Sequence, residues 1–258
     1  MIRKEITIFL TAIMFYTRIP IPANTEFSAD YLNKSTRYFP FIGILVGGIG
    51  AVIFLLIHAI LPLNIAIILS MASTILVTGA FHEDGFSDFS DGFGGGYTKE
   101  RILEIMKDSR IGTYGAIALV LMLFTKFLSI SSTSVIDIPL LLISAHSLSR
   151  LTSVCMIYTS SYVREDALSK SKPIGHRGSW SSFVVALILG FLPLCFMPLV
   201  FTLLVIFMLS LTLFFFRWYV HKIIGGYTGD VLGALQQISE VVIYLGFLIY
   251  TQNFICAS

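Results

Sequence analysis

The sequence predicts an all-α, polytopic integral membrane helix bundle, with about seven transmembrane helices and an N-terminal interfacial or re-entrant helix. Hydrophobic residues make up 56% of the chain, charged residues only 12%, and the mean hydropathy is +0.86. A soluble globular protein carries about 25% charged residues, so this chain cannot cover a water-facing surface. Apolar stretches of about 20 residues, the length that crosses a bilayer core, recur along it. We expect one membrane-embedded domain over residues 1–258.

Seven apolar stretches have the length of a membrane span or nearly so. In the first, Gly43 and Gly47 have a small-xxx-small spacing that lets another helix approach closely. The fifth is short and interrupted by Pro193. Residues 6–15 are apolar but stop before Arg18, so we interpret them as the interfacial or re-entrant helix. The seven stretches are 39–61, 63–81, 111–130, 138–158, 180–197, 199–218 and 231–250.

The basic residues predict the orientation in the membrane. Apart from Lys126, every Lys and Arg falls before the first stretch or near alternate connections, on one side of the membrane. The positive-inside rule then makes the N-terminus and the long polar loops cytoplasmic and the C-terminus external. The net charge of +2 is too small to indicate a nucleic-acid partner, and the three scattered cysteines exclude a disulfide scaffold.

An acidic and glycine-rich segment, HEDGFSDFSDGFGGG, follows the second stretch at residues 82–96. Its aspartates are spaced i, i+4, i+7, which places three carboxylates on one face of a helix. Carboxylate oxygens are the ligands that Mg²⁺ prefers, and glycines let backbone amides approach an anion. A solvated, acidic helix start is the alternative, but the interleaved phenylalanines favour partial burial. The candidate metal ligands are Asp84, Asp88 and Asp91, and the candidate anion-binding glycines are Gly94, Gly95 and Gly96.

Residues 99–110 read KERILEIMKDSR and predict an amphipathic helix on the cytosolic surface. Its first charged residues form a solvated face in this interpretation. Lys107, Asp108 and Arg110 lie where the chain enters the membrane, and Arg110 could neutralise a phosphate.

Further polar residues occur inside two later stretches. His146 and Arg150, spaced i, i+4, should face the bundle interior, either as a structural pair with an acid or as ligands of a substrate phosphate. The last stretch is preceded by GGYTGD at residues 225–230, which is either an anion site at a helix N-terminus or a glycine-rich turn with an N-capping Asp. The candidate ligands there are Gly226, Thr228, Asp230, Gln237 and Glu240.

Four segments together resemble the cobalamin synthase family, whose members are adenosylcobinamide-GDP ribazoletransferases. They occur in the family's order and span nearly the whole chain. They are FYTRIP at 15–20, the acidic segment at 82–96, LEIMKDSRIG at 103–112, and GGYTGDVLG at 225–233 with Gln236, Gln237 and Glu240.

The resemblance implies a Mg²⁺-dependent reaction in vitamin B12 assembly, at the cytoplasmic face of a prokaryotic inner membrane. The 3'-hydroxyl of α-ribazole, or of its 5'-phosphate, attacks the cobinamide-linked phosphorus of adenosylcobinamide-GDP, and GMP leaves. A free carboxylate, Glu83 or Asp108, would accept the hydroxyl proton. Homo-oligomerisation and contacts with other membrane enzymes of cobalamin assembly stay open.

Two other function classes use the same scarce acids. A cation- or proton-coupled transporter would bind near the bilayer midplane and show repeated halves, whereas most acids here lie at the cytosolic mouth. Only Glu240 is deep enough to suit it. A non-catalytic scaffold would leave the three aspartates unexplained.

Overall fold

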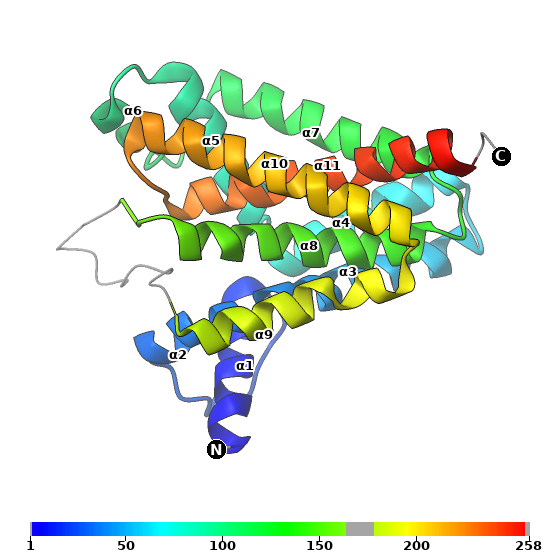
Figure 1. Ribbon diagram of the computed structural model, residues 1–258, viewed down its shortest axis with the longest axis horizontal. Helices are drawn as coiled ribbons and strands as arrows, with labels where there is room; N and C mark the ends of the chain where they lie inside the picture. The colour runs from blue at the N-terminus through cyan, green and yellow to red at the C-terminus, as the bar shows by residue number, and fades with distance from the viewer. Residues whose placement is uncertain (1, 164–177, 256–258) are drawn as a thin grey trace.

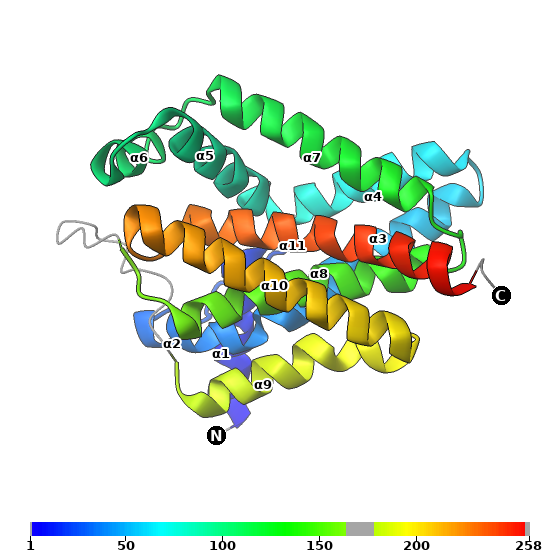
Figure 2. The ribbon, with the colours of Figure 1, turned by 45° about the horizontal axis from the view of Figure 1, so that its top comes forward.

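The computed structural model describes residues 2–163 and 178–255, which are almost entirely helical (Figure 1). Within these residues the only β contact is an isolated parallel bridge between Tyr162 and Tyr227. The long helices lie side by side along one direction (Figures 1 and 2). They are α3 (Phe39–His58), α7 (Thr113–Ser131), α8 (Ile138–Thr159), α10 (Leu199–Ile224) and α11 (Gly229–Tyr250).

Five helical segments of the described chain are long and apolar enough to cross a membrane. They correspond to five of the predicted spans, those at 39–61, 111–130, 138–158, 199–218 and 231–250, and the all-α membrane-bundle prediction is confirmed. The segments are Ala29–His58, Thr113–Ser131, Ile138–Thr159, Leu199–Ile224 and Gly229–Phe254.

The predicted span at 63–81 is shorter than expected. Helix α4 (Leu63–Thr78) ends at Gly79, and α5 (Phe81–Gly95) leaves at 88° to it. The break has a backbone cause, because Gly79 (φ 67°) and Ala80 (φ 58°) both take left-handed conformations that an α-helix cannot continue through. The bent pair counts as one broken span or as a re-entrant loop.

The predicted span at 180–197 is also shorter than expected. Helix α9 (Trp180–Phe191) gives way to a 3₁₀ turn, η2 (Leu192–Phe196), which contains Pro193. Proline cannot donate the backbone hydrogen bond that would continue the α-helix. The described chain therefore has five spans by length, or six with the bent pair, in place of seven.

The N-terminal helix α1 (Ile2–Tyr16) lies across the direction of the long helices (Figures 1 and 2). It is longer than the predicted 6–15, and it buries Ile8 and Ala12 against the bundle. This crosswise position is the one that an interfacial helix takes.

The central helix is α8, which is buried along most of its length. Helix α3 packs against it at Gly43 and Gly47, as the small-xxx-small spacing predicted. A Cβ added at Gly43 would overlap the backbone of His146, and one at Gly47 would overlap the backbone at Ile143. The two backbones therefore touch, which is possible only without side chains at these positions.

The bundle has two chemically different ends. One end carries α2 (Ala29–Ser35), α6 (Lys99–Ile105) and the turn into α11, and the other carries the C-terminus and the turn between α3 and α4 (Figure 1). Basic residues belong to the first end, among them Lys34, Lys99 and Arg101. This separation agrees with the predicted distribution of charge.

Candidate active site

Close backbone packing brings the acidic segment on α5 next to the glycine-rich segment that opens α11. A Cβ added at Gly85 would come 3.0 Å from Asp230 Cα, and one at Gly233 would come 3.2 Å from the His82 carbonyl oxygen. A side chain at either glycine would therefore crowd the backbone of the other helix. Two motifs that are far apart in the sequence form one surface as a result.

The three predicted aspartates all lie on α5, but they differ in their surroundings. Asp84 is exposed, Asp88 is half-buried and Asp91 is buried. Asp91 accepts hydrogen bonds from the backbone N–H groups of Gly112 (2.7 Å) and Gly115 (2.9 Å). Those groups belong to the N-terminus of α7, so Asp91 holds that helix end, a role that its spacing did not reveal.

No group of three or more His, Cys, Asp or Glu in the described segments is arranged to hold a metal ion. Asp84 and Asp88 are one helical turn apart, and Asp84 is exposed, whereas both oxygens of Asp91 accept backbone hydrogen bonds. Mg²⁺ is commonly bound by one or two carboxylates together with substrate phosphates. The donor set therefore fits a Mg²⁺ ion shared with a substrate better than one held by the protein alone.

An open groove of about 580 Å³ lies between α5, α6 and the start of α7. It brings together Asp91, Gly95, Asp108 and Arg110, four of the residues that the sequence singled out. The helix end at α5 also carries Gly94, and Gly96 caps its C-terminus. The segment that follows α6 carries Lys107.

Asp108 and Arg110 form a two-pronged ion pair at this groove. Arg110 Nε donates to Asp108 Oδ1 at 3.0 Å and Arg110 Nη2 donates to Oδ2 at 2.6 Å. The Arg110 guanidinium and backbone N–H hold the pKa of Asp108 down at about 2. A carboxylate with so low a pKa is a weak proton acceptor, which favours Glu83 among the two candidate bases.

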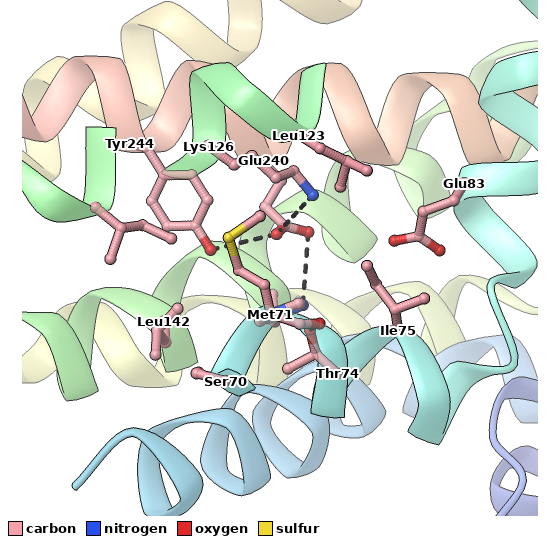
Figure 3. Close-up of a pocket in the computed structure, with 12 residues that line it drawn as sticks. Ser70, Met71, Thr74, Ile75, Glu83, Leu123, Lys126, Leu142, Glu240 and Tyr244 are labelled. Atoms are coloured by element: carbon pink, nitrogen blue, oxygen red, sulfur yellow. Dashed lines mark hydrogen bonds and ion pairs between the residues drawn. The ribbon is translucent and has the colours of Figure 1, made fainter. Parts of the chain in front are cut away.

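A buried polar cluster lies deeper in the bundle, where α5, α7, α8 and α11 meet (Figure 3). Lys126 on α7 and Glu240 on α11 are 4% and 2% exposed, and Lys126 Nζ lies 2.9 Å from Glu240 Oε1. Tyr244 OH donates to the same carboxylate oxygen at 3.2 Å. Sequence reasoning noted Lys126 as an exception and gave it no role, although a lysine inside a span needs a partner.

Two glutamines link this ion pair to α5. Lys126 Nζ donates to Gln237 Oε1 at 2.5 Å, and Gln237 Nε2 donates to Glu83 Oε1 at 2.9 Å. Gln236 Nε2 donates to Glu240 Oε2 at 2.8 Å. Among the described residues, Glu83 Oε2 is buried with no hydrogen-bond partner. Glu83 and the ion pair line a cavity of about 20 Å³, room for about one water molecule.

His146 and Arg150 point into the bundle, as predicted, but the expected acid partner of Arg150 is absent from the described part of the chain. Arg150 Nη1 donates to the His146 carbonyl oxygen at 2.8 Å, and its guanidinium lies over the Phe39 ring at 5.6 Å. His146 Nδ1, not Arg150, approaches an acid, 3.5 Å from Glu240 Oε2. The Asp-pairing interpretation of Arg150 is therefore wrong for these residues.

The turn into α11 is capped by threonine. Thr228 Oγ1 accepts from the Val231 N–H at 3.3 Å, so the alternative of an N-capping Asp at 230 is wrong. Thr98 caps α6 in the same way, accepting from the Arg101 N–H at 3.3 Å. The GGYT string that occurs twice thus ends in a helix cap each time. Gly226 packs against the Ser161 carbonyl oxygen.

The fold and the site define a multi-pass membrane protein that gathers carboxylates, glycines and basic residues near one end of its bundle. The family model described as Cobalamin-5-phosphate synthase matches residues 8–248. The chain belongs to this family, and it is a transferase.

Curated relatives match the chain from end to end. A protein of Shewanella amazonensis is 42% identical over 253 residues, covering 96% of each chain, and one of Shewanella piezotolerans is 43% identical over 251 residues with the same coverage. One of Vibrio parahaemolyticus is 40% identical, covering 98% of this chain and 96% of its own. All three are named adenosylcobinamide-GDP ribazoletransferase. No solved structure matches this chain.

Proposed function

We propose that this chain joins adenosylcobinamide-GDP to α-ribazole, or to its 5'-phosphate, and releases GMP. The observation that carries the proposal is the match to ribazoletransferases along 96% of the chain. The acids, glycines and basic residues that gather at one end of the bundle are the groups that chemistry on a diphosphate needs. Family membership favours this transferase over the cation- or proton-coupled transporter.

In the proposed reaction the ribazole 3'-oxygen forms a bond to the cobinamide-linked phosphorus. The bond from that phosphorus to the bridging oxygen breaks, and GMP leaves with the electron pair. The hydroxyl proton goes to a carboxylate, for which Glu83 is better suited than Asp108, whose pKa the Arg110 pair depresses. Two exposed cations, Lys107 and Arg110, are the groups that neutralise the diphosphate.

Asp84 and Asp88 would hold a Mg²⁺ ion together with the substrate phosphates, and Asp91 would add to them from one turn further along α5. The ion supplies charge neutralisation for the diphosphate and for the leaving phosphate. Residues 94–96 would offer backbone amides to the phosphates. His146, Arg150, Gly226, Thr228 and Asp230 remain proposed substrate-site residues, directly or through their neighbours. Gln237 and Glu240 are buried, and they would act on the substrate through Glu83.

The proposed active site faces the cytoplasm of a prokaryotic cell, from its inner membrane. The support is the concentration of basic residues on α2, α6 and the end of α10, on the side where the groove opens. We also propose the loop 159–179 as a further wall of a vestibule for the substrate, and its residues 164–177 lie outside the described residues.

The test supplies adenosylcobinamide-GDP, α-ribazole and Mg²⁺ to the purified protein in liposomes. Stoichiometric GMP and a cobalamin product should appear, and EDTA should stop both. Running α-ribazole and its 5'-phosphate in parallel compares kcat/KM for the two acceptors. Release of GDP in place of GMP would put bond cleavage at the wrong atom and reject the mechanism.

A further inference from the structure

The buried cluster around Lys126 fixes which way a glutamine side chain faces. A lysine ammonium has only hydrogen-bond donors, so the atom of Gln237 that lies 2.5 Å from Lys126 Nζ must be the amide oxygen. The amide nitrogen of Gln237 then faces the other way. It lies 2.9 Å from Glu83 Oε1 and 2.8 Å from Gln236 Oε1, and both of these atoms accept.

The same chain of hydrogen bonds closes on itself. Gln236 uses its oxygen for Gln237, and its nitrogen donates to Glu240 Oε2 at 2.8 Å. Glu240 Oε1 in turn accepts from Lys126 Nζ at 2.9 Å. Four buried side chains from α7 and α11 therefore form a ring in which each amide has one allowed orientation. Reversing Gln237 would set two donors against each other at Lys126 and two acceptors against each other at Glu83.

Glu83 is the acid that links the ring to α5. Its Oε1 is held by Gln237, whereas its Oε2 is buried without a hydrogen-bond partner among the described residues. In Figure 3 the Glu83 carboxylate points into the cavity that Lys126, Glu240 and Tyr244 also line. A buried carboxylate oxygen without a partner is costly, and a water in this cavity would satisfy it.

We propose that Lys126 is a positioning residue for the transfer reaction: through Gln237 it orients Glu83 so that Oε2 faces the one-water cavity, where a water relays the proton of the attacking hydroxyl to it. The proposal rests on the proposed function for the identity of that hydroxyl. In this arrangement the substrate stays outside the cavity, so Lys126, which lines it, does not touch the substrate. Glu240 forms an ion pair with the buried Lys126 ammonium. This pairing offsets the cost of burying the charge of the lysine inside the bundle.

The test uses Lys126→Met/Glu240→Met, which removes both charges and leaves neither buried alone. In this variant Gln237 loses the ammonium that holds its amide oxygen, and it keeps only the contacts of its amide nitrogen with Glu83 and Gln236. We expect kcat to fall about 10- to 100-fold with KM changed less than about twofold, since orientation of a proton acceptor is lost and substrate contacts are not. Ser239→Ala is the control on the same helix, because the Ser239 hydroxyl is buried without a partner. It should keep the wild-type kcat.

A double-mutant cycle separates positioning from general damage. Glu83→Met alone should lower kcat about 100-fold or more. Adding Lys126→Met/Glu240→Met to it should cost nothing further, because the ring acts only through Glu83. Equal losses in both backgrounds would overturn the proposal. If the double methionine variant does not fold, Gln237→Leu cuts the same link and leaves the ion pair intact, and the same non-additivity is expected.

A readout without substrate keeps the proposal apart from the proposed function. The chain has three glutamines, at 236, 237 and 252, and Gln252 is exposed. With ¹⁵N in the glutamine side chains, NMR should show two slowly exchanging amide pairs in wild type and in Ser239→Ala, and one or none in Lys126→Met/Glu240→Met. Unchanged protection in that variant would reject the ring. A changed amide spectrum in a protein that never makes GMP would instead reject the proposed function.

Discussion

Asp91 shows how one side chain of an acidic motif can serve the helix that follows it. Its two carboxylate oxygens accept the N–H groups of Gly112 and Gly115, which no residue inside α7 can satisfy. Both glycines are close enough that a Cβ at either would overlap the carboxylate. Asp84, on the same face of α5, is exposed. The helical spacing of the aspartates therefore does not show that Asp91 has a structural role that Asp84 lacks.

This difference predicts unequal effects on stability. Asp91→Ala should lower the free energy of unfolding by about 1–3 kcal/mol, because one buried and one part-buried backbone N–H lose a charged acceptor. Asp84→Ala should leave the thermal unfolding temperature unchanged while it lowers turnover at limiting Mg²⁺. Thermal unfolding in detergent and GMP release measure the two effects. Identical unfolding temperatures for both variants would show that Asp91 does not hold α7.

The Asp108–Arg110 pair predicts a pH dependence. Because the folded pKa of Asp108 is about 2, against an ordinary value of 3.8, the pair stabilises the protein above about pH 4 and loses that contribution as the pH falls towards 2. Asp108 therefore stays ionised throughout the working range. In Arg110→Gln its pKa should return towards 3.8, the shape of the kcat/KM profile should stay the same above pH 5.5, and KM should rise. An acid limb that moves with Arg110→Gln would make Asp108 the proton acceptor.

Helix α5 exists as a separate element because two consecutive residues, Gly79 and Ala80, are left-handed. The sequence predicted a span that ends at residue 81 and an acidic helix after it, but not the 88° bend between them. An alanine in this conformation gives no compositional signal. The first residues of α6 and α11 could have been predicted better, because the threonine before each helix is a typical N-cap.

The contact between α3 and α8 predicts opposite effects on stability when two glycines of α3 are replaced by alanine. Gly43→Ala should destabilise the protein by about 1–3 kcal/mol, because its Cβ would overlap the His146 backbone and push the helices apart. Gly48→Ala is the control, since nothing lies within 4 Å of a Cβ there, and it should keep or slightly raise stability. Thermal unfolding of both in one detergent measures this. Equal changes in the two variants would mean that the contact of Gly43 with α8 does not decide stability.

Most charged residues lie near one end of the bundle, and an ion pair is buried inside it. The sequence predicted the first feature and not the second. The spans, the close approach at Gly43 and the gathering of acids near one end followed from composition and spacing. The pairing of Lys126 with Glu240 did not, because the two residues are 114 positions apart and only the tertiary fold sets α7 against α11. The cost of a lone lysine in a span was the signal that a partner had to exist.

The arrangement predicts which sites are reachable from outside the cell. In a background with Cys155, Cys195 and Cys256 replaced by alanine, Gly94→Cys should be protected from an impermeant thiol reagent in intact cells, and Ser134→Cys should react. Both positions are exposed, so accessibility reports sidedness alone. Permeabilised cells, in which both should react, are the control. Labelling of Gly94→Cys in intact cells would invert the orientation.

Helix α5 also constrains how this protein is made. It carries Glu83, Asp84, Asp88 and Asp91, and each acid would cost about 2.5–3.5 kcal/mol at the centre of a helix leaving the translocon alone. Its main packing partner is α11, which the ribosome synthesises last. Helix α5 therefore cannot reach its final position during synthesis, and it must remain near the membrane surface until α11 has been synthesised. A nascent chain truncated before residue 229 should consequently be a preferred substrate of membrane quality-control proteases, whatever the stability of its other spans.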